Sequence, residues 1–159
     1  MPPHSIKQTK IPRRQEAMTP EDRMQIELQC TRLVTAFAVN LDLRRYDEVI
    51  ALFTQDTVYR PRQTTFNGHE GVRAYLESRP RHRVSRHVIS NCLVDVLSPD
   101  EARGFCVLTY FVDEGPVAEG EPAPLAGARL IGDYHDRFVR TPDGWRIVER
   151  IGEIVFERK

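Results

Sequence analysis

The sequence predicts a single α+β domain, in which N-terminal helices pack on a curved antiparallel sheet that encloses a pocket for a small molecule. Segments with the period of an amphipathic helix come first, up to about residue 77, and segments with the two-residue period of a strand follow. Helices followed by strands are typical of α+β folds, whereas α/β folds alternate the two. The 159 residues are enough for one hydrophobic core and too few for two ordinary domains.

Composition excludes several classes of partner. The formal net charge is zero, so no overall attraction to nucleic acid or to an anionic membrane is expected. No apolar run approaches the roughly 20 residues that cross a bilayer, and the N-terminus lacks the apolar segment of a secretory signal. The chain has three cysteines, Cys30, Cys92 and Cys106, and no two of them form a CxxC pair. We therefore expect them to be small buried side chains, with no disulfide or metal site. We therefore expect a cytoplasmic protein.

Residues 1–18 form a basic, proline-containing arm that stands apart from the domain predicted over residues 19–159. Its basic residues are Lys7, Lys10, Arg13 and Arg14. The arm shows no apolar period. Two interpretations stay open: a frayed tail, or a segment held against this subunit or a neighbouring one.

Three helices are expected in the first half of the domain. Thr19 is a hydroxyl N-cap, Pro20 suits the first turn, and two acids follow at the positive end of the helix dipole. An apolar stripe extends this helix to about residue 41; its members are Ile26, Cys30, Leu33, Val34, Phe37 and Leu41. Shorter helices are predicted over Tyr46–Phe53 and Glu70–Glu77. Between them, residues 57–59 open a short strand that Pro61 is expected to confine to a sheet edge, and Asn67-Gly68 forms a turn.

Four long strands are expected in the second half. The first two cover Val84–Leu97 and Ala102–Val112, and the last two cover Arg129–Arg140 and Trp145–Phe156. A turn with Gly144 at positive φ joins the last two, and Trp145 is expected to pack in the core. The connection over residues 114–127 is too long for a tight hairpin. A flap over the pocket, a subunit contact and a solvated loop stay open for it.

Few residues have a context that supports chemistry. The glycine fingerprints of dinucleotide- and phosphate-binding loops are absent, as is a GxSxG nucleophile elbow. His82 and His87 are five residues apart in a strand-like segment and point to opposite faces, so no metal site is expected. Two candidates remain: Asp42, just past the apolar stripe of the first helix, and His87.

Alternation along the first long strand places four residues on one face: Ser85, His87, Ile89 and Asn91. Three polar residues among these four indicate a wet or ligand-holding cavity. A carboxylate that accepts a hydrogen bond from one imidazole nitrogen leaves the other as a base near neutral pH. Asp42 and His87 would then remove a proton from carbon or activate water. In the alternative interpretation, Asp42 is a solvated acid at a helix end and His87 is a strand histidine with satisfied hydrogen bonds.

Four segments in order carry a resemblance to a known family. LDLRRYDEVIALFTQDTVYR, FNGHEGVRAYL, RHVISN and YHDRFVRTPDGWRIVER resemble the SnoaL-like branch of the nuclear transport factor 2-like superfamily, over about residues 20–157. The resemblance implies a cone-shaped (α+β barrel) fold, in which helices cap a strongly bent antiparallel sheet around one open hydrophobic cavity. The superfamily includes both enzymes and binding proteins.

Within that branch the pattern is similar to the scytalone dehydratase and hexachlorocyclohexane dehydrochlorinase group, which uses an Asp–His dyad without metal or cofactor. Asp42 and His87 match the two dyad positions. The resemblance implies that His87 takes a proton from carbon while Asp42 orients the imidazole. It thus implies a cofactor-independent lyase or isomerase, dehydratase-like, acting on a small apolar ring compound.

The chain departs from that group at two helper positions. A pocket lysine is replaced by Phe37, and a second histidine on the next strand by Phe111 and Val112. The candidates for binding the substrate are Phe37, Tyr59, Ser85, Asn91 and Tyr110. On the third long strand, alternation leaves open whether residues 134 and 136 or residues 135 and 137 face inward.

Other functions stay open at this point. The fold also suits a non-catalytic carrier of small molecules, a structural subunit similar to the β chain of ring-hydroxylating dioxygenases, a polyketide cyclase or an epoxide hydrolase. In each case the expected ligand is a small hydrophobic or aromatic molecule. Sheets of this shape often leave one outer face apolar, which leads us to expect a homodimer or homotrimer.

Overall fold

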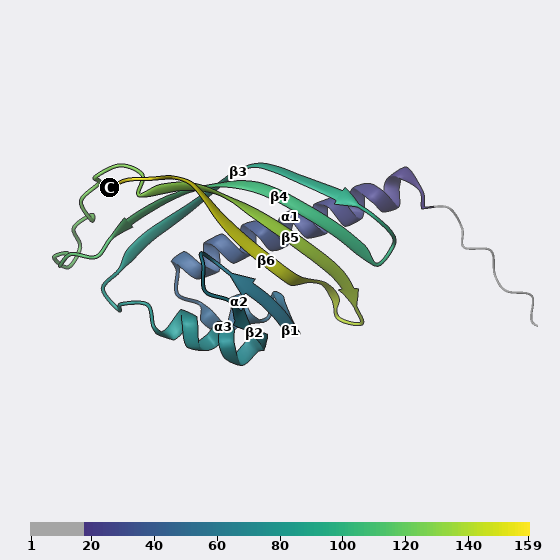
Figure 1. Cartoon of the computed structure of the whole chain (residues 1–159), viewed down its shortest axis with the longest axis horizontal. Coiled ribbons are helices and arrows are strands. Elements are labelled where there is room, and N and C mark those ends of the chain that lie inside the picture. The colour runs from purple at the N-terminus through teal and green to yellow at the C-terminus, as the bar shows by residue number, and fades with distance from the viewer. Residues whose placement is uncertain (1–17) are drawn as a thin grey trace, which may run out of the picture.

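The computed structural model describes residues 18–159, which form three helices and six strands (Figure 1). The helices are α1 (Pro20–Asp42), α2 (Tyr46–Ile50) and α3 (Gly68–Glu77). The strands are β1 (Phe53–Arg60), β2 (Phe66–Asn67), β3 (Val84–Val96), β4 (Glu101–Asp113), β5 (Leu130–Thr141) and β6 (Gly144–Glu157). Apart from Met18, the predicted N-terminal arm lies outside the described residues.

The strands form one sheet in the order β2-β1-β6-β5-β4-β3. Helices precede the long strands, so the predicted α+β class is confirmed. All neighbours are antiparallel except β1 and β6, which are parallel, so the prediction of a wholly antiparallel sheet is wrong at this pair. A parallel pair needs a long connection, and here α3 and three long strands lie between β1 and β6.

The predicted edge position of the first short strand is also wrong, because β1 lies between β2 and β6. Pro61 follows the last residue of β1, so its missing N–H removes no hydrogen bond from the ladder. The helix predicted over Tyr46–Phe53 ends earlier, at Ile50. Phe53 instead begins β1 and is buried in the core.

Helix α1 begins with the predicted capping residues. The Thr19 hydroxyl accepts a hydrogen bond from the backbone N–H of Asp22 at 3.1 Å, and the Asp22 carboxylate accepts one from the Thr19 N–H at 3.2 Å. The two bonds form a capping box, which satisfies donors that a helix start leaves free. The helix ends at Asp42, and Arg44 then turns the chain with φ of 56°.

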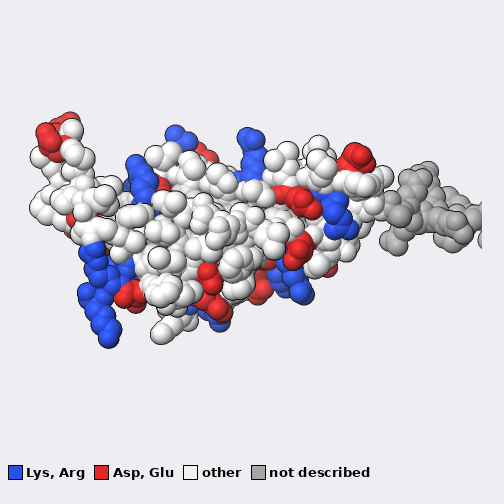
Figure 2. All heavy atoms as spheres, turned by 90° about the horizontal axis from the view of Figure 1, so that it is seen from above, with Lys and Arg blue, Asp and Glu red and all other residues white. Residues whose placement is uncertain are grey.

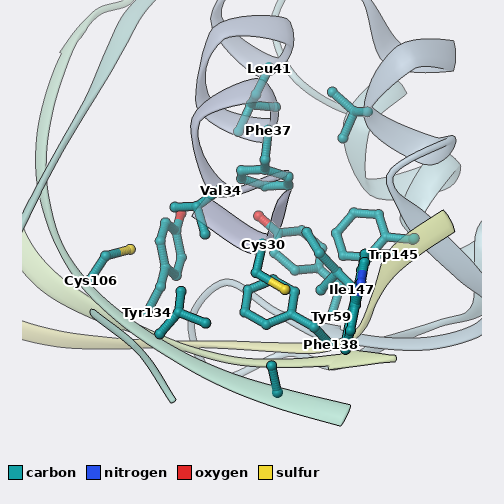
Figure 3. Packing of buried hydrophobic residues seen from close by; sticks show 14 of the residues in the cluster. Cys30, Val34, Phe37, Leu41, Tyr59, Cys106, Tyr134, Phe138, Trp145 and Ile147 are labelled. Atoms are coloured by element: carbon teal, nitrogen blue, oxygen red, sulfur yellow. The ribbon is translucent and has the colours of Figure 1, made fainter. Parts of the chain in front are cut away.

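Helix α1 runs lengthwise beside β3 to β6, whereas α2, α3, β1 and β2 gather below them (Figure 1). Phe37 on α1 lies at the centre of the core (Figure 3). Its ring centroid is 5.8 Å from that of Phe53, 5.7 Å from that of Tyr59 and 6.2 Å from that of Tyr134. Trp145 is also buried in this core, as predicted.

Strand β3 contains a bulge that the sequence pattern did not reveal. Its register against β4 shifts between Ser90 and Leu93, and Asn91 has φ of 49°. Before the bulge Ser85, His87 and Ile89 share the inner face, but Asn91 is exposed. The prediction that all three cysteines are buried is wrong for Cys92, which lies in the bulge and is exposed.

Strands β5 and β6 form the predicted hairpin, with Gly144 at φ of 104° in its turn. Tyr134 and Asp136 face inward and are buried, whereas His135 and Arg137 face outward, which settles the alternation on this strand. On the face shown in Figure 2, positive and negative side chains are both spread along the molecule, in keeping with the net charge of zero. Within residues 18–159, no helix has the length and apolar character needed to span a membrane.

Candidate functional site

Asp42, the last residue of α1, reaches across to β3. Its Oδ1 lies 2.6 Å from Nδ1 of His87, and its Oδ2 accepts a hydrogen bond from the His87 backbone N–H at 2.7 Å. The Ser85 hydroxyl donates a third hydrogen bond to Oδ1, at 2.8 Å. Three donors from one strand therefore hold this carboxylate at the end of the helix.

The contact determines which imidazole nitrogen is available. An ionised carboxylate only accepts hydrogen bonds, so Nδ1 of His87 carries the hydrogen that faces Asp42. Nε2 has no hydrogen-bond partner among residues 18–159. The two side chains are nearly buried, with 9% of the His87 side chain and 8% of the Asp42 side chain exposed. In the neutral imidazole, Nε2 then presents a lone pair, as a general base requires.

The hydrogen bonds on Asp42 favour its ionised form. Burial is the largest influence and acts to raise the pKa of Asp42, but the hydrogen bonds from His87 and Ser85 and the charge of a protonated His87 together outweigh it. The pKa of Asp42 is therefore lower than its ordinary value of 3.8. At neutral pH this carboxylate is available to orient the imidazole.

Arg79 extends the network behind Ser85. Its Nη2 donates a hydrogen bond to the Ser85 hydroxyl at 2.9 Å, and its Nη1 donates one to the carbonyl oxygen of Leu41 at 2.9 Å. The Leu41 carbonyl belongs to the last turn of α1, which has no basic residue of its own. Arg79 therefore ties the end of α1, the segment after α3 and the start of β3 together around Asp42.

His87 lines a cavity of about 290 Å³. One wall comes from α3 and the segment that follows it, and the other from the inner face of β4 to β6. The aromatic and charged lining residues are Tyr59, Arg62, Tyr75, Arg79, Arg83, His87, Tyr110, Glu114, Arg129, Asp133, Tyr134 and Glu153. The cavity thus combines four tyrosines with four arginines and three acidic residues, in a volume that suits a small molecule.

The structure brings together some of the predicted substrate-binding residues and separates others. Tyr59 and Tyr110 line the cavity, and the Tyr110 ring lies 4.6 Å from the His87 ring. Ser85 is buried behind His87 and bonds to Asp42. Phe37 is fully buried in the core and does not line the cavity. Asn91 lies in the bulge of β3, away from it.

Sequence reasoning missed Tyr75, Tyr134, Arg79 and Arg83, all of which line the cavity. A signal for the two arginines is visible in the segment RPRHRVSR, where four arginines precede His87. Such a basic run is usually a solvated surface, so a sequence pattern alone does not distinguish a residue that lines a cavity from one that faces solvent.

The described cysteines do not offer a nucleophile. Burial raises the pKa of Cys30 and of Cys106 to about 12, so both thiols stay protonated at neutral pH. The pKa of Cys92 is raised as well, because neighbouring groups partly shield this otherwise exposed thiol from water. No group of three or more potential metal ligands occurs among residues 18–159.

Comparison with known families gives one match, to the SnoaL-like domain, over residues 22–151. This range contains both Asp42 and His87. No curated protein matches the sequence.

Several solved structures share the fold. A provisional scytalone dehydratase from Novosphingobium aromaticivorans has 20% sequence identity and a TM-score of 0.72, over 88% of this chain and 91% of that one. The hexachlorocyclohexane dehydrochlorinase LinA-type3 from Novosphingobium barchaimii has 17% identity and a TM-score of 0.71, over 88% and 93%. An NTF2-like protein with a cystatin-like fold, also from Novosphingobium aromaticivorans, has 18% identity and a TM-score of 0.67, over 83% of each chain. At sequence identities of 17–20%, the similarity to these three structures is a similarity of fold.

Proposed function

This chain belongs to the SnoaL-like domain family, and on that premise we propose that it is a cofactor-independent lyase of the dehydratase type. In this proposal the Asp42–His87 pair is the general base, and the substrate is a small ring compound that occupies the cavity beside His87. The observation that carries the proposal is the 2.6 Å contact between Asp42 Oδ1 and His87 Nδ1, on a residue that lines the cavity and whose Nε2 has no hydrogen-bond partner in the described part of the chain.

The reaction uses Nε2 of His87 as the proton acceptor. Nε2 takes a proton from a ring carbon, and the electron pair of that C–H bond becomes the second bond of a new C=C. The C–O bond on the neighbouring carbon breaks, and the oxygen departs with its electron pair. It leaves as water after it receives the proton that His87 has taken, which returns the imidazole to its neutral form. An isomerase would return the proton to another carbon of the ring.

Asp42 has two roles in this scheme. Its hydrogen bond with Nδ1 holds the tautomer in which Nε2 is the base, and its negative charge stabilises the imidazolium while the proton is on His87. The second bond, from the His87 backbone N–H, aligns the strand with the helix end. The resulting orientation does not depend on the substrate.

The lining of the cavity supports a ring compound as the ligand. Tyr59, Tyr75, Tyr110 and Tyr134 present aromatic surface to it. Aromatic side chains contact a flat apolar molecule over a large area, and their hydroxyl groups can orient its oxygen atoms. The proposal therefore favours ring alcohols whose departing hydroxyl lies one carbon away from an acidic C–H.

The test uses ring β-hydroxyketones, such as 3-hydroxycyclohexanone and 3-hydroxy-1-tetralone. Loss of water from the first gives a conjugated enone and from the second gives 1-naphthol after tautomerisation, so both are followed by ultraviolet absorbance. We expect the protein to accelerate water loss from at least one ring alcohol of this class. His87→Gln should lower kcat about 10²- to 10⁴-fold, the usual contribution of a general base.

The matched control for this variant is His135→Gln, because His135 lies on the outer face of β5 and does not line the cavity. It should retain the activity of the unaltered protein, and both variants should show unaltered circular dichroism. Activity that survives His87→Gln would exclude His87 as the base. A complete lack of turnover by the unaltered protein across the class, together with binding of its members, would identify a carrier.

A further inference from the structure

We propose that Arg83, supported by Arg79 and the Tyr110 hydroxyl, forms an anion-binding subsite in the cavity, and that the natural ligand is a ring compound bearing a carboxylate. This inference deepens the proposed function and rests on it in one respect, the use of the same cavity for the substrate. It adds a charged group to the small hydrophobic or aromatic ligand that the sequence leads us to expect.

The two arginines lie in the segment that joins α3 to β3, and both line the cavity together with His87. Hydrogen bonds attach this segment to the end of α1 and to the turn that follows it. Arg79 donates to the Leu41 carbonyl at 2.9 Å, and Arg44 donates hydrogen bonds to the carbonyls of Pro80 and Arg83. The guanidinium groups therefore project from a backbone that is held in place before any ligand binds, which reduces the entropic cost of binding.

Arg83 retains hydrogen-bonding capacity. Its Nε is buried and has no hydrogen-bond partner among the described residues. Its Nη2 pairs with Glu114, at the edge of the cavity. An unsatisfied buried donor is costly, and a carboxylate matches the two parallel N–H groups of a guanidinium.

Tyr110 connects this subsite to the proposed base. The Tyr110 ring lies 4.6 Å from the His87 ring. Burial raises the pKa of Tyr110 above 10.0, while the positive charges of Arg83 and Arg79 act in the opposite direction. The hydroxyl is therefore protonated at neutral pH and lies within the influence of both arginines, where it is a further donor for an anion.

Three acidic residues line the cavity, Glu114, Asp133 and Glu153, and within the described part of the chain only Glu114 forms an ion pair with Arg83. Asp42 is engaged by three donors from β3 and does not line the cavity. The Glu114 side chain is 53% exposed, and ion pairs to such exposed groups are weak. Arg79 forms no ion pair with a carboxylate within residues 18–159. A ligand carboxylate can thus replace Glu114 at Arg83, with its ring toward the tyrosines and His87.

The experiment compares benzoate with benzamide, which has nearly the same shape and no charge. Binding is measured by isothermal titration calorimetry at low ionic strength, up to about 10 mM ligand, which detects a Kd near 1 mM. We expect benzoate to bind about 10- to 100-fold more tightly than benzamide, the range for hydrogen bonds to a charged group. Arg83→Gln should abolish this preference, and Arg83→Lys should retain part of it, because the charge stays and the planar fork is lost.

Arg86→Gln is the matched control. It removes the same charge three residues away, from a side chain that does not line the cavity. It should leave the preference for benzoate unaltered. The inference is overturned if benzoate fails to bind, if it binds no better than benzamide, or if Arg83→Gln keeps the preference in a variant whose thermal unfolding shows that it is folded.

The two proposals can fail separately. Benzoate binding requires no chemistry at His87, so His87→Gln should still discriminate between the two ligands. An Arg83-dependent preference in a protein without dehydration activity would support the subsite and overturn the lyase. His87-dependent water loss without any preference for benzoate would support the lyase and overturn the subsite.

Discussion

Among residues 18–159, two aspartates with nearly buried side chains are paired with a basic side chain at 2.6–2.7 Å, and the surroundings of the two pairs differ. Asp42 and His87 join the end of α1 to β3, beside a cavity. Asp136 and Arg150 lie opposite each other on β5 and β6, with both oxygens of the carboxylate bonded to the guanidinium at 2.7 Å.

The Asp136–Arg150 pair is enclosed by the core. Only 1% of the Asp136 side chain and none of the Arg150 side chain is exposed. The guanidinium carbon lies 4.3 Å from the centroid of the Phe37 ring and 4.7 Å from that of Tyr134. Burial acts to lower the pKa of Arg150, but the Asp136 carboxylate outweighs it and the pKa is raised. Arg150 therefore keeps its proton.

Contact with a carboxylate therefore does not by itself make a side chain a base. An arginine side chain stays protonated in a protein and cannot act as a base, so the role of the Asp136–Arg150 pair is to stabilise the packing around it. A histidine titrates near neutral pH and has a second nitrogen. At His87 that nitrogen belongs to a residue lining a cavity, so only this pair is suited to moving a proton.

The largest expected effect concerns the enclosed pair. Arg150→Met should lower the free energy of unfolding by about 3–5 kcal/mol, because it leaves the Asp136 carboxylate buried without a partner. Urea unfolding followed by circular dichroism measures the loss. The double variant Arg150→Met/Asp136→Leu should recover most of it, since no charge then stays in the core. A loss below about 1 kcal/mol in the single variant would contradict a structural role for this pair.

A smaller effect on stability is expected at the pair beside the cavity. Asp42→Asn should lower the free energy of unfolding at pH 7 by about 2 kcal/mol, because the acceptor of these hydrogen bonds is then a neutral amide oxygen. The decrease in kcat should be larger than the decrease in the fraction of folded protein explains, because the amide no longer selects the tautomer of His87. Urea unfolding and the water-loss assay on the same preparation measure the two effects, and an unaltered kcat would contradict the orienting role of Asp42.

The same pair predicts a dependence of stability on pH. The pKa of Asp42 is lower in the folded protein than its ordinary value of 3.8, so the unfolded chain binds more protons as the pH falls. The contribution of Asp42 to stability is therefore complete at pH values well above 3.8, and it is lost as the pH falls through the pKa of Asp42 in the folded protein. Urea unfolding between about pH 2 and pH 7 should show this loss in the unaltered protein. In Asp42→Asn this contribution should be absent, and an identical pH profile in the two proteins would contradict it.

The smallest expected effect lies far from both pairs, at the exposed capping box of α1. Thr19→Ala removes the hydroxyl that accepts from the Asp22 N–H, and should lower the free energy of unfolding by about 1 kcal/mol. The activity should stay unaltered, because the other end of α1 carries Asp42. A decrease in activity larger than the loss of folded protein would show that the two ends of the helix are coupled.

Local signals predicted much of the architecture. The cap at Thr19, the apolar stripe up to Leu41 and the turn at Gly144 each depend on residues close in sequence, and the structure confirms all three. Asp42 and His87, taken from the resemblance and from residue chemistry, are in contact across 45 positions. Their catalytic role stays a prediction.

Other features could not be predicted in this way. The parallel pairing of β1 with β6 depends on segments about 90 residues apart along the chain. The bulge at Asn91 reverses the alternation of β3, although the sequence shows no interruption there. Arg79 and Arg83 look like part of a solvated basic run until α3 and β3 place them at the cavity.

Most helix and strand boundaries can be predicted from the sequence, because caps, turns and apolar periods act between near neighbours along the chain. Which polar residues meet depends on the folded structure, since hydrogen bonds and burial depend on distances in space. Asp136 could have faced either side of β5, and the packing around Phe37 and Arg150 determines that it faces the core. The same packing places His87 in the lining of the cavity, together with Tyr110 and two arginines.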